Sequence, residues 1–228
     1  MTVPDLPRLR DLAGMQAFIQ ANTRLLPVAG LAGAGAPLLL WQADAVTPIW
    51  SATETDLNRQ GLDPPFWAFP WAGGQAIARL ILEQPGIVQG KRVLDIACGS
   101  GLIAIAAARA RAAQVVANDI DPLCEAAVAL NAAANGVTVA WRGGDLLGGP
   151  APDVDVIVAG DVFYQRQMAD RFVEWLSRAA EGGAAVYAGD PGRAYAPRDL
   201  APPVAEYDID TSLDLESAVF RRTRVWRL

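Results

Sequence analysis

The stretch from residue 91 to residue 188 repeats one alternation of a short apolar run, a turn and a longer Ala-rich or amphipathic stretch. Short uninterrupted apolar runs are typical of strands buried on both faces, whereas longer stretches with apolar residues at helical spacing are typical of helices. The resulting order is βαβαβ followed by βαβ, which favours a mostly parallel sheet with helices on both faces. Strands are predicted at 92–96, 114–118, 137–141, 154–159 and 184–188, and helices at 102–112, 122–135 and 165–180.

The C-terminal part has a different character. Prolines at positions 197, 202 and 203 precede two strand-like runs, 204–209 and 218–228, which are joined by a polar link. Two such runs in sequence predict an antiparallel hairpin. The fold class is therefore α/β, with a Rossmann-like, mostly parallel sheet of seven strands that ends in a C-terminal hairpin.

Residues 1–60 are less regular and predict one helix at 9–22 and one strand at 37–41. The uncharged stretch 25–41 is interrupted by prolines and glycines and is short for a bilayer span, so we interpret it as loop and strand. The N-terminus mixes acidic and basic residues and lacks the pattern of a secretory signal. No strong linker follows, so we predict a single domain, with 1–60 as an extension packed on the core formed by 61–228.

The sequence contains no histidine. Without imidazole a Ser-His-Asp or Cys-His relay is excluded and the commonest transition-metal ligand is missing, so we predict no metal site. Lys91 is the only lysine, so Schiff-base chemistry would depend on that one residue. Cys98 and Cys124 form neither a Cys-x-x-Cys pair nor a disulfide framework, which predicts reduced thiols and a cytoplasmic protein.

The net charge is −6 and the isoelectric point is about 4.7. Nonspecific binding to nucleic acid or to an anionic membrane depends on basic surfaces, so we expect neither partner. A cationic substrate or ligand suits an acidic protein better.

A glycine-rich loop follows the strand at 92–96. It reads Ala-Cys-Gly-Ser-Gly at 97–101 and leads directly into a predicted helix. Glycines let the backbone turn tightly and approach a ligand, and the helix N-terminus offers free N–H groups. Gly99 and Gly101, with Ala104 in the third small-residue position, are compatible with a dinucleotide-binding loop as well, so the glycines alone leave an NAD site open.

Carboxylates at the ends of three strands could contact a cofactor, and the first of them favours S-adenosylmethionine (SAM) over NAD. Asp95 lies on the strand just ahead of the loop, where a carboxylate would oppose a pyrophosphate but would suit the cationic amino group of SAM. Asp119 ends the second strand, where an acceptor can bind both ribose hydroxyls. Asp145 could accept from the exocyclic amine of adenine, with Leu146 against the ring. Each carboxylate could instead serve only a turn or a cap.

These residues resemble the class I, seven-β-strand SAM-dependent methyltransferases. Segments 64–75, 160–164 and 189–193 narrow the resemblance to the bacterial members of the electron-transfer flavoprotein β-subunit lysine methyltransferases. The similarity extends from 18–23 to 222–226, which is nearly the whole chain. The Phe-Trp-Ala-Phe-Pro-Trp and Gly-Asp-Pro-Gly-Arg segments are its narrow markers, whereas the glycine loop indicates only the superfamily. Ala97 departs from the pattern, because many superfamily members have a glycine there.

The resemblance implies a site for lysine methylation. In the family, an Asp-x-x-Tyr motif faces the transferred methyl, which here is Asp161 and Tyr164, and Trp71 matches a position that lines the SAM site. The implied activity is in-line methyl transfer to the electron-transfer flavoprotein β subunit, with SAM as cofactor. Asp161 would bind and orient the lysine, Tyr164 would complete the wall or bond the amine, and the surround would be apolar. The residues expected in that surround are Phe163, Trp67 and Phe69.

Other interpretations stay open at this point. The same cofactor half would serve a methyltransferase of a ribosomal protein or of a small molecule. A noncatalytic nucleotide-binding module or an NAD-dependent dehydrogenase is a further alternative, opposed by the retention of Asp161 and Tyr164 and by Asp95. The aromatic residues of 66–71 could also simply anchor the N-terminal extension to the core.

Overall fold

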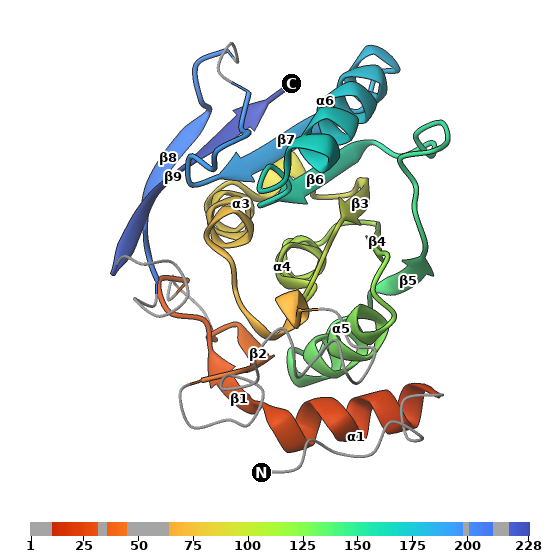
Figure 1. Ribbon diagram of the computed structural model, residues 1–228, viewed down its shortest axis with the longest axis vertical. Coiled ribbons are helices and arrows are strands. Elements are labelled where there is room, and N and C mark those ends of the chain that lie inside the picture. The colour runs from red at the N-terminus through yellow and green to blue at the C-terminus, as the bar shows by residue number, and fades with distance from the viewer. Residues whose placement is uncertain (1–10, 32–35, 45–63, 198–200, 212–218) are drawn as a thin grey trace.

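A computed structural model describes residues 11–31, 36–44, 64–197, 201–211 and 219–228 (Figure 1). Within them a seven-stranded sheet has the order β5-β4-β3-β6-β7-β9-β8. The first five of these strands are parallel, and β9 is antiparallel to both β7 and β8. The sheet strands are β3 (Arg92–Ile96), β4 (Gln114–Asp119), β5 (Ala140–Gly143), β6 (Val156–Gly160), β7 (Ala185–Asp190), β8 (Ala205–Asp210) and β9 (Phe220–Arg227).

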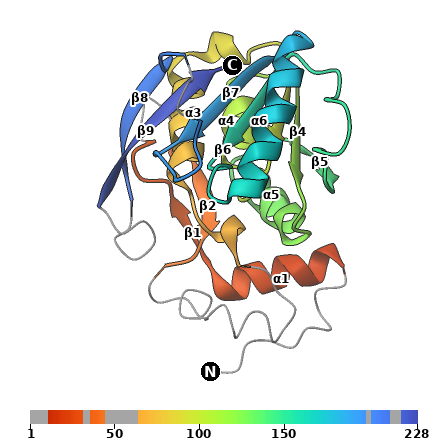
Figure 2. The ribbon, with the colours of Figure 1, turned by 45° about the horizontal axis from the view of Figure 1, so that its top comes forward.

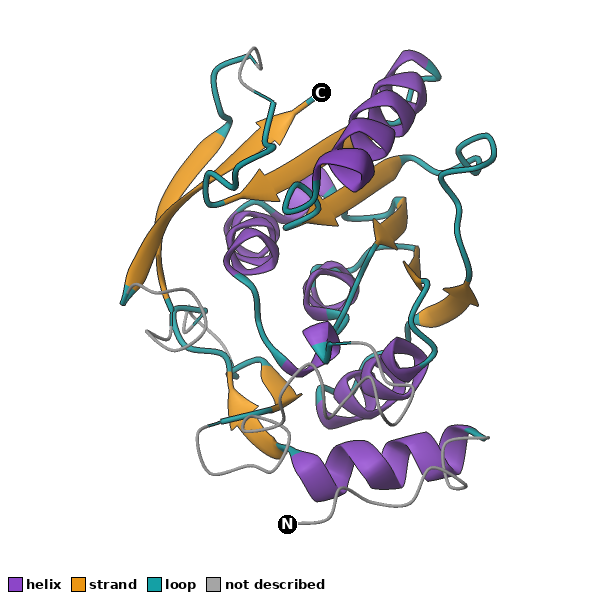
Figure 3. Ribbon diagram, in the orientation of Figure 1, coloured by secondary structure: helices purple, strands orange, loops and turns teal. Residues whose placement is uncertain are grey.

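Helices cover both faces of the sheet, as Figure 3 shows. Helices α3, α4 and α5 lie on one face and α6 on the other, and each face has its own apolar core. Strand β6 shows the two-residue period of a buried strand, since Val156 and Val158 pack with the first core and Ile157 and Ala159 with the second. The helices are α1 (Leu12–Asn22), α3 (Ala72–Glu83), α4 (Leu102–Arg109), α5 (Leu123–Ala134) and α6 (Arg166–Glu181), with short 3-10 turns η3 (Phe66–Ala68) and η4 (Pro85–Ile87).

The N-terminal part forms a small unit against α5. Strands β1 (Arg24–Pro27) and β2 (Leu39–Gln42) pair antiparallel, and α1 lies along α5 (Figure 2). The Phe18 ring of α1 meets the Trp67 ring edge-on at 6.4 Å between centroids. This arrangement agrees with an extension packed on the core, while the predicted boundary at residue 60 lies outside the described residues.

The predicted fold class is confirmed, and most predicted elements appear at nearly the expected bounds. The strand predicted at 137–141 is shifted, because Gly136 is left-handed and the Val137 N–H still donates to the Ala132 carbonyl at 3.1 Å. The helix predicted at 102–112 ends earlier, because Arg111 has a φ of 63° and begins the exit turn. Both errors lie at a helix C-terminus, where residues of apolar composition form the exit turn and not a regular element.

The helix predicted to begin at residue 122 starts one residue later, with Pro122 at its N-cap. The Asp121 carboxylate still accepts from the Leu123 N–H at 2.8 Å. The predicted helix at 9–22 begins at Leu12 in the described part of the chain. None of the helices in the described ranges combines the length and the apolar character that crossing a bilayer requires.

Candidate active site

The carboxyl ends of the parallel strands meet at one edge of the sheet, and the predicted site residues gather there. Strands β3, β4, β6 and β7 all end at this edge, and Gly160 pairs with Gly189 where β6 and β7 finish. The N-terminus of α3 packs directly onto these two strand ends. Ligands of open α/β sheets bind at this edge, so it holds the candidate active site.

The glycine loop turns through the left-handed region of backbone space. Gly99 and Gly101 have φ values of 50° and 76°, and a Cβ on Gly101 would lie 2.8 Å from a Val128 methyl. Gly101 is also the N-cap of α4 and provides no side-chain cap, so the first N–H groups of that helix face the loop. Ala97 has a φ of 54°, which strains an alanine by ~1–2 kcal/mol where the family pattern places glycine.

Asp95 is completely buried beneath this loop. Its Oδ2 accepts from the Ala104 N–H at 2.9 Å, while Oδ1 has no partner among the described residues. Burial raises the pKa of Asp95 to about 8, and the charge of Asp119 adds to the rise. The carboxyl therefore fixes the first turn of α4 from below, and its predicted contact with a cofactor amino group stays a prediction.

Asp119 closes the loop from the neighbouring strand. Its Oδ2 accepts from the Gly99 N–H at 3.0 Å, and its Oδ1 accepts from the N–H groups of Ile120 and Asp121 at 2.8 and 3.1 Å. The Cys124 thiol also hydrogen-bonds this carboxylate, and the contact of Asp119 with both ribose hydroxyls stays a prediction. The structure thus brings Asp119 to the loop, as the predicted role requires.

Asp145 and Leu146 lie beyond the end of β5. Asp145 is about half exposed, and its carboxylate accepts from Arg171 on α6 at 2.6 Å and from the Leu147 N–H at 2.9 Å. The hydrogen bond from Arg171 holds the pKa of Asp145 below its usual range. Leu146 packs against the core beneath α6. The Arg171 partner was not expected from the sequence, and the adenine contact stays a prediction.

Asp161 follows β6 in a constrained conformation. Its φ is 58°, its N–H donates to the Gly189 carbonyl at 2.9 Å, and its Oδ2 accepts from the Gly74 N–H at 3.0 Å. Gly73 makes this approach possible, because a Cβ there would lie 2.6 Å from Asp161 Oδ2. The remaining oxygen, Oδ1, accepts from Arg193 Nη2 at 2.9 Å.

Burial raises the pKa of Asp161 to about 6. Arg193 opposes that rise and the nearby Asp190 carboxylate adds to it. Burial also raises the pKa of the Tyr164 phenol, with the charge of Asp119 adding to the rise. Asp161 is therefore ionised at pH 7, and Tyr164 keeps its proton there.

An aromatic rim, which we define as Phe66, Trp71 and Tyr164, borders Asp161. The Phe66 ring lies 6.0 Å from that of Trp71 and 5.6 Å from that of Tyr164, and Trp71 Nε1 donates to the Phe66 carbonyl at 2.8 Å. Phe66 and Tyr164 are exposed. The rim gives the site an apolar border that is open to solvent.

The apolar surround differs from the expected one. Trp67 and Phe163 are 0% and 1% exposed and belong to the two cores, so the simple anchoring interpretation holds for Trp67, and Phe163 packs beneath α6. Phe69 is also buried and reaches the rim through an edge contact with Trp71 at 5.6 Å. The aromatic segment therefore divides, because Trp67 and Phe69 enter the core while Phe66 and Trp71 border the site.

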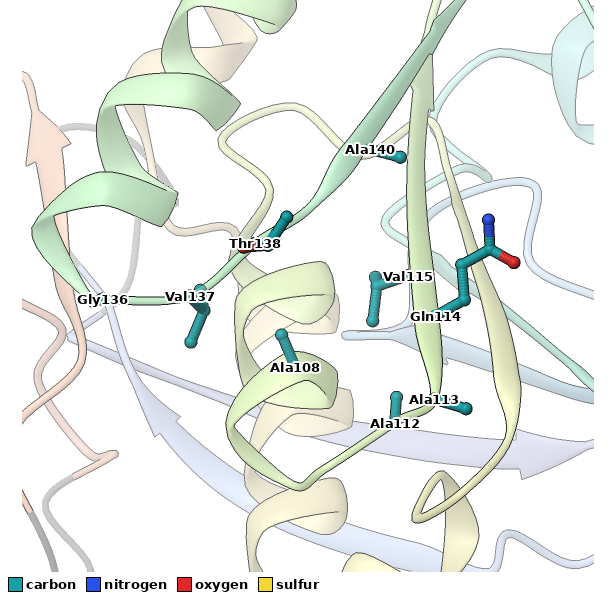
Figure 4. Close-up of a pocket in the computed structure, with 9 residues that line it drawn as sticks. All are labelled: Ala108, Ala112, Ala113, Gln114, Val115, Gly136, Val137, Thr138 and Ala140. Atoms are coloured by element: carbon teal, nitrogen blue, oxygen red, sulfur yellow. The ribbon is translucent and has the colours of Figure 1, made fainter.

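A shallow pocket of about 410 Å³ elsewhere on the molecule has none of this chemistry (Figure 4). It lies beside Gln114 and Val115, at the amino end of β4, and its lining contains no titratable side chain. The carboxylates of the candidate site lie at the opposite end of the strands. The figure shows mainly small side chains, and we assign the pocket no catalytic role.

Comparison with known proteins identifies the family of the chain. The profile of the family described as ribosomal protein L11 methyltransferase (PrmA) matches residues 77–181. The electron transfer flavoprotein beta subunit lysine methyltransferase of Xenopus laevis is 40% identical over 169 residues, covering 71% of this chain and 68% of that protein. The human protein of the same name is 34% identical over 170 residues, covering 71% of this chain and 64% of its own length.

Solved structures share the fold. A putative RNA methyltransferase from Pyrococcus horikoshii superposes with a TM-score of 0.51 at 16% identity, covering 68% of this chain and 79% of that one. TrmN from Thermus thermophilus superposes with a TM-score of 0.50 at 25% identity, covering 68% and 48%. The identity and coverage shared with the Xenopus enzyme place this chain in the electron transfer flavoprotein beta subunit lysine methyltransferase family of SAM-dependent methyltransferases.

Proposed function

We propose that this chain methylates lysine side chains of the electron transfer flavoprotein β subunit and that Asp161 receives the lysine. The relatives named for that substrate support the choice of acceptor. The observation that carries the assignment of the site is the buried Asp161 carboxylate, which lies at the carboxyl end of a parallel strand beside the aromatic rim. The carboxylate oxygens can accept hydrogen bonds from the amino head of lysine, and the apolar rings suit its methylene stem.

The residues at the strand ends fit SAM. Gly99 and Gly101 provide the close backbone approach, Asp119 lies at the loop where it would accept from the ribose, and Asp95 has an oxygen without a partner among the described residues. Trp71 would border the methyl end. Asp145 and Leu146 would border the adenine. When bound, the cofactor supplies a methyl group on a sulfonium, which becomes a neutral thioether once the methyl has left.

The chain must present the lysine as a neutral amine. A free lysine with a pKa near 10.4 is neutral about once in 2,500 at pH 7, which costs ~4–5 kcal/mol. Asp161 orients the amine, the aromatic rim limits its hydration, and the displaced proton leaves to water. The amine nitrogen then forms its bond to the methyl carbon as the carbon–sulfur bond breaks. Alignment of the two reactants supplies part of the barrier reduction, up to ~7–11 kcal/mol in the best cases.

Exchange of Asp161 for Asn tests this function. We expect Asp161→Asn to lower methyl transfer from labelled SAM to purified electron transfer flavoprotein by ~100-fold or more, because the amine is no longer held in line. Label on β-subunit lysines is mapped by mass spectrometry, and SAM affinity is measured by calorimetry. The affinity should stay near wild type.

Asp170→Asn is the matched control, because this exposed carboxylate lies on α6 outside the site. It should transfer methyl groups at the wild-type rate. A near-normal rate in Asp161→Asn would contradict the role of Asp161. Label on ribosomal protein L11 and none on the flavoprotein would instead favour the acceptor named for the matching family profile.

We place this activity in the cytoplasm. Cys98 and Cys124 are both buried as free thiols, and burial raises the pKa of each well above its ordinary value. Such thiols resist oxidation, and they suit a reducing compartment without requiring one.

A further inference from the structure

The candidate catalytic carboxylate is already paired inside the protein. Arg193 Nη2 lies 2.9 Å from Asp161 Oδ1, and the side chains are 21% and 10% exposed. The sequence identified the Gly-Asp-Pro-Gly-Arg segment at 189–193 as a family marker but gave its arginine no role. The structure brings that arginine to the carboxylate from a strand end 32 residues away.

The backbone around Arg193 is built to hold the arginine in this place. Asp190 is completely buried at the end of β7, and its Oδ1 accepts from the N–H groups of Gly192 and Arg193 at 2.7 and 2.6 Å. Gly192 takes a φ of 87°, which lets the chain double back. The Arg193 guanidinium also lies over the Trp71 ring, 5.6 Å from its centroid. Asp190 therefore fixes the backbone of Arg193, while Asp161 and Trp71 contact its guanidinium.

This pairing changes what an incoming lysine meets. A lone carboxylate beside an ammonium would raise the pKa of the lysine and oppose the deprotonation that methyl transfer needs. With Arg193 present, the pair is neutral overall. Both Asp161 oxygens are fixed, one by Arg193 and one by the Gly74 N–H, and each keeps a further lone pair for an amine.

We propose that Arg193 is a positioning residue for methyl transfer, which fixes the Asp161 carboxylate and neutralises its charge so that the acceptor lysine binds as a neutral amine. This inference rests on the proposed function of Asp161. Other ionisable groups near the site are Asp190 on β7, Tyr164 on the segment of Asp161 itself, and Asp119, whose charge acts on Tyr164. From α3 the contact is the uncharged Gly74 N–H.

The test compares the pH profiles of three variants. Without the guanidinium the Asp161 pKa rises, so in Arg193→Gln the acid limb of kcat/KM should move up by ~1–3 pH units. At pH 7 the variant should therefore be slower by ~10-fold or more, and the deficit should shrink as the pH approaches 9. Arg193→Lys keeps the positive charge but loses the planar guanidinium. Its acid limb of kcat/KM should therefore lie close to the wild-type position.

Arg166→Gln is the matched control, since Arg166 is exposed on α6 and lies over the Tyr195 ring, 5.1 Å from its centroid. It removes one positive charge nearby and should leave the profile unchanged. SAM affinity should stay within ~2-fold of wild type in all three variants, as expected for a residue that acts through Asp161.

The outcomes separate this inference from the proposed function. An Arg193→Gln enzyme whose profile matches wild type overturns the role of Arg193, and a faster enzyme at pH 7 would show that Arg193 blocks the place of the lysine. If Arg193→Gln fails to fold, Arg193→Lys decides the question. This variant keeps the positive charge, so an acid limb of kcat/KM that moves up by the full ~1–3 pH units would overturn the proposal. A near-normal rate in Asp161→Asn would instead refute the proposed function and this inference together.

Discussion

Asp95 and Asp161 are buried carboxyls at neighbouring strand ends, yet their surroundings separate them. Asp161 has a guanidinium and a backbone N–H as partners, and its pKa rises only to about 6. Asp95 has one backbone N–H and faces the charge of Asp119, and burial takes its pKa to about 8. In the ligand-free protein at pH 7, Asp161 is ionised and Asp95 is mostly protonated, although both are aspartates.

This difference predicts a pH-dependent stability that Asp95 controls. A pKa raised on folding gives stability that is complete below the unfolded value of about 3.8 and is lost as the pH rises through about 8. The free energy of unfolding of the ligand-free protein should therefore fall by up to ~1.4 kcal/mol per pH unit between pH 6.5 and 8. Urea unfolding at several pH values measures it.

The variant Asp95→Asn keeps an oxygen for the Ala104 N–H and cannot titrate. Its stability should be flatter than wild type over the same range, and the shared titrations of other groups cancel in the difference. Parallel curves for the two proteins would show that Asp95 is already ionised in the folded state.

At the scale of elements, α5 connects the N-terminal hairpin to the glycine loop through one side chain. Asn131 is completely buried in an Ala-rich helix; its Oδ1 accepts from the Trp41 N–H of β2 at 2.7 Å and its Nδ2 donates to the Ser100 carbonyl at 2.9 Å. Asn135, one turn later, bonds both the N–H and the carbonyl of Leu39 and also donates to the Asn131 carbonyl. Both asparagines therefore hydrogen-bond strand β2 of the hairpin, and Asn131 also hydrogen-bonds the glycine loop.

Exchanging each asparagine for alanine separates these contacts. Asn131→Ala removes the partner of the part-buried Trp41 N–H and of the buried Ser100 carbonyl, so it should destabilise the protein by ~2–4 kcal/mol. It should also weaken SAM binding, because the loop loses its support at Ser100. Asn135→Ala should destabilise the protein and leave SAM affinity near wild type. Thermal unfolding and calorimetry measure both effects, and equal affinities in the two variants would contradict the link to the loop.

At the scale of the molecule, the sequence predicts a structural feature correctly where that feature depends on a single helix or strand. Short apolar runs predicted β3, β4, β6 and β7 at nearly their observed bounds, and two strand-like runs predicted β8 and β9, whereas the strand predicted at 137–141 was shifted from β5. The sheet order then brings the residues after each parallel strand to one edge, which is why Asp95, Asp119 and Asp161 could be predicted to lie together. Strand β1 was not predicted as a separate element, since its four residues show no buried pattern of their own.

Contacts between side chains of distant elements could not be predicted in this way. The pairs of Asp161 with Arg193 and of Asp145 with Arg171 depend on the register of β7 and on the rotation of α6. Neither the strand register nor the helix rotation can be predicted from a local sequence pattern. A mixed aromatic segment has the same limitation, because composition alone does not tell that Trp67 enters the core while Phe66 and Trp71 border the site.

The predicted division at residue 60 leads to a test of the whole molecule. Ile19 is completely buried, and it shares one core with Phe18, Trp67 and the residues of α5. A fragment of residues 61–228 would expose that core and would lose the hairpin partners of Asn131 and Asn135. Losses of one large apolar contact and of buried hydrogen bonds each amount to ~1–3 kcal/mol, which together approach the stability of an ordinary domain.

We therefore expect the fragment 61–228 to lose cooperative thermal unfolding and to show a Trp emission shifted toward that of exposed indole. Circular dichroism and fluorescence measure these properties, and the full chain under the same conditions is the control. A fragment that unfolds cooperatively within ~5 °C of the full chain would show that residues 1–60 add little to the core, since ~1 kcal/mol shifts the midpoint of a domain of this size by a few degrees. The extension would then be an appendage, although it contributes Ile19 to the core.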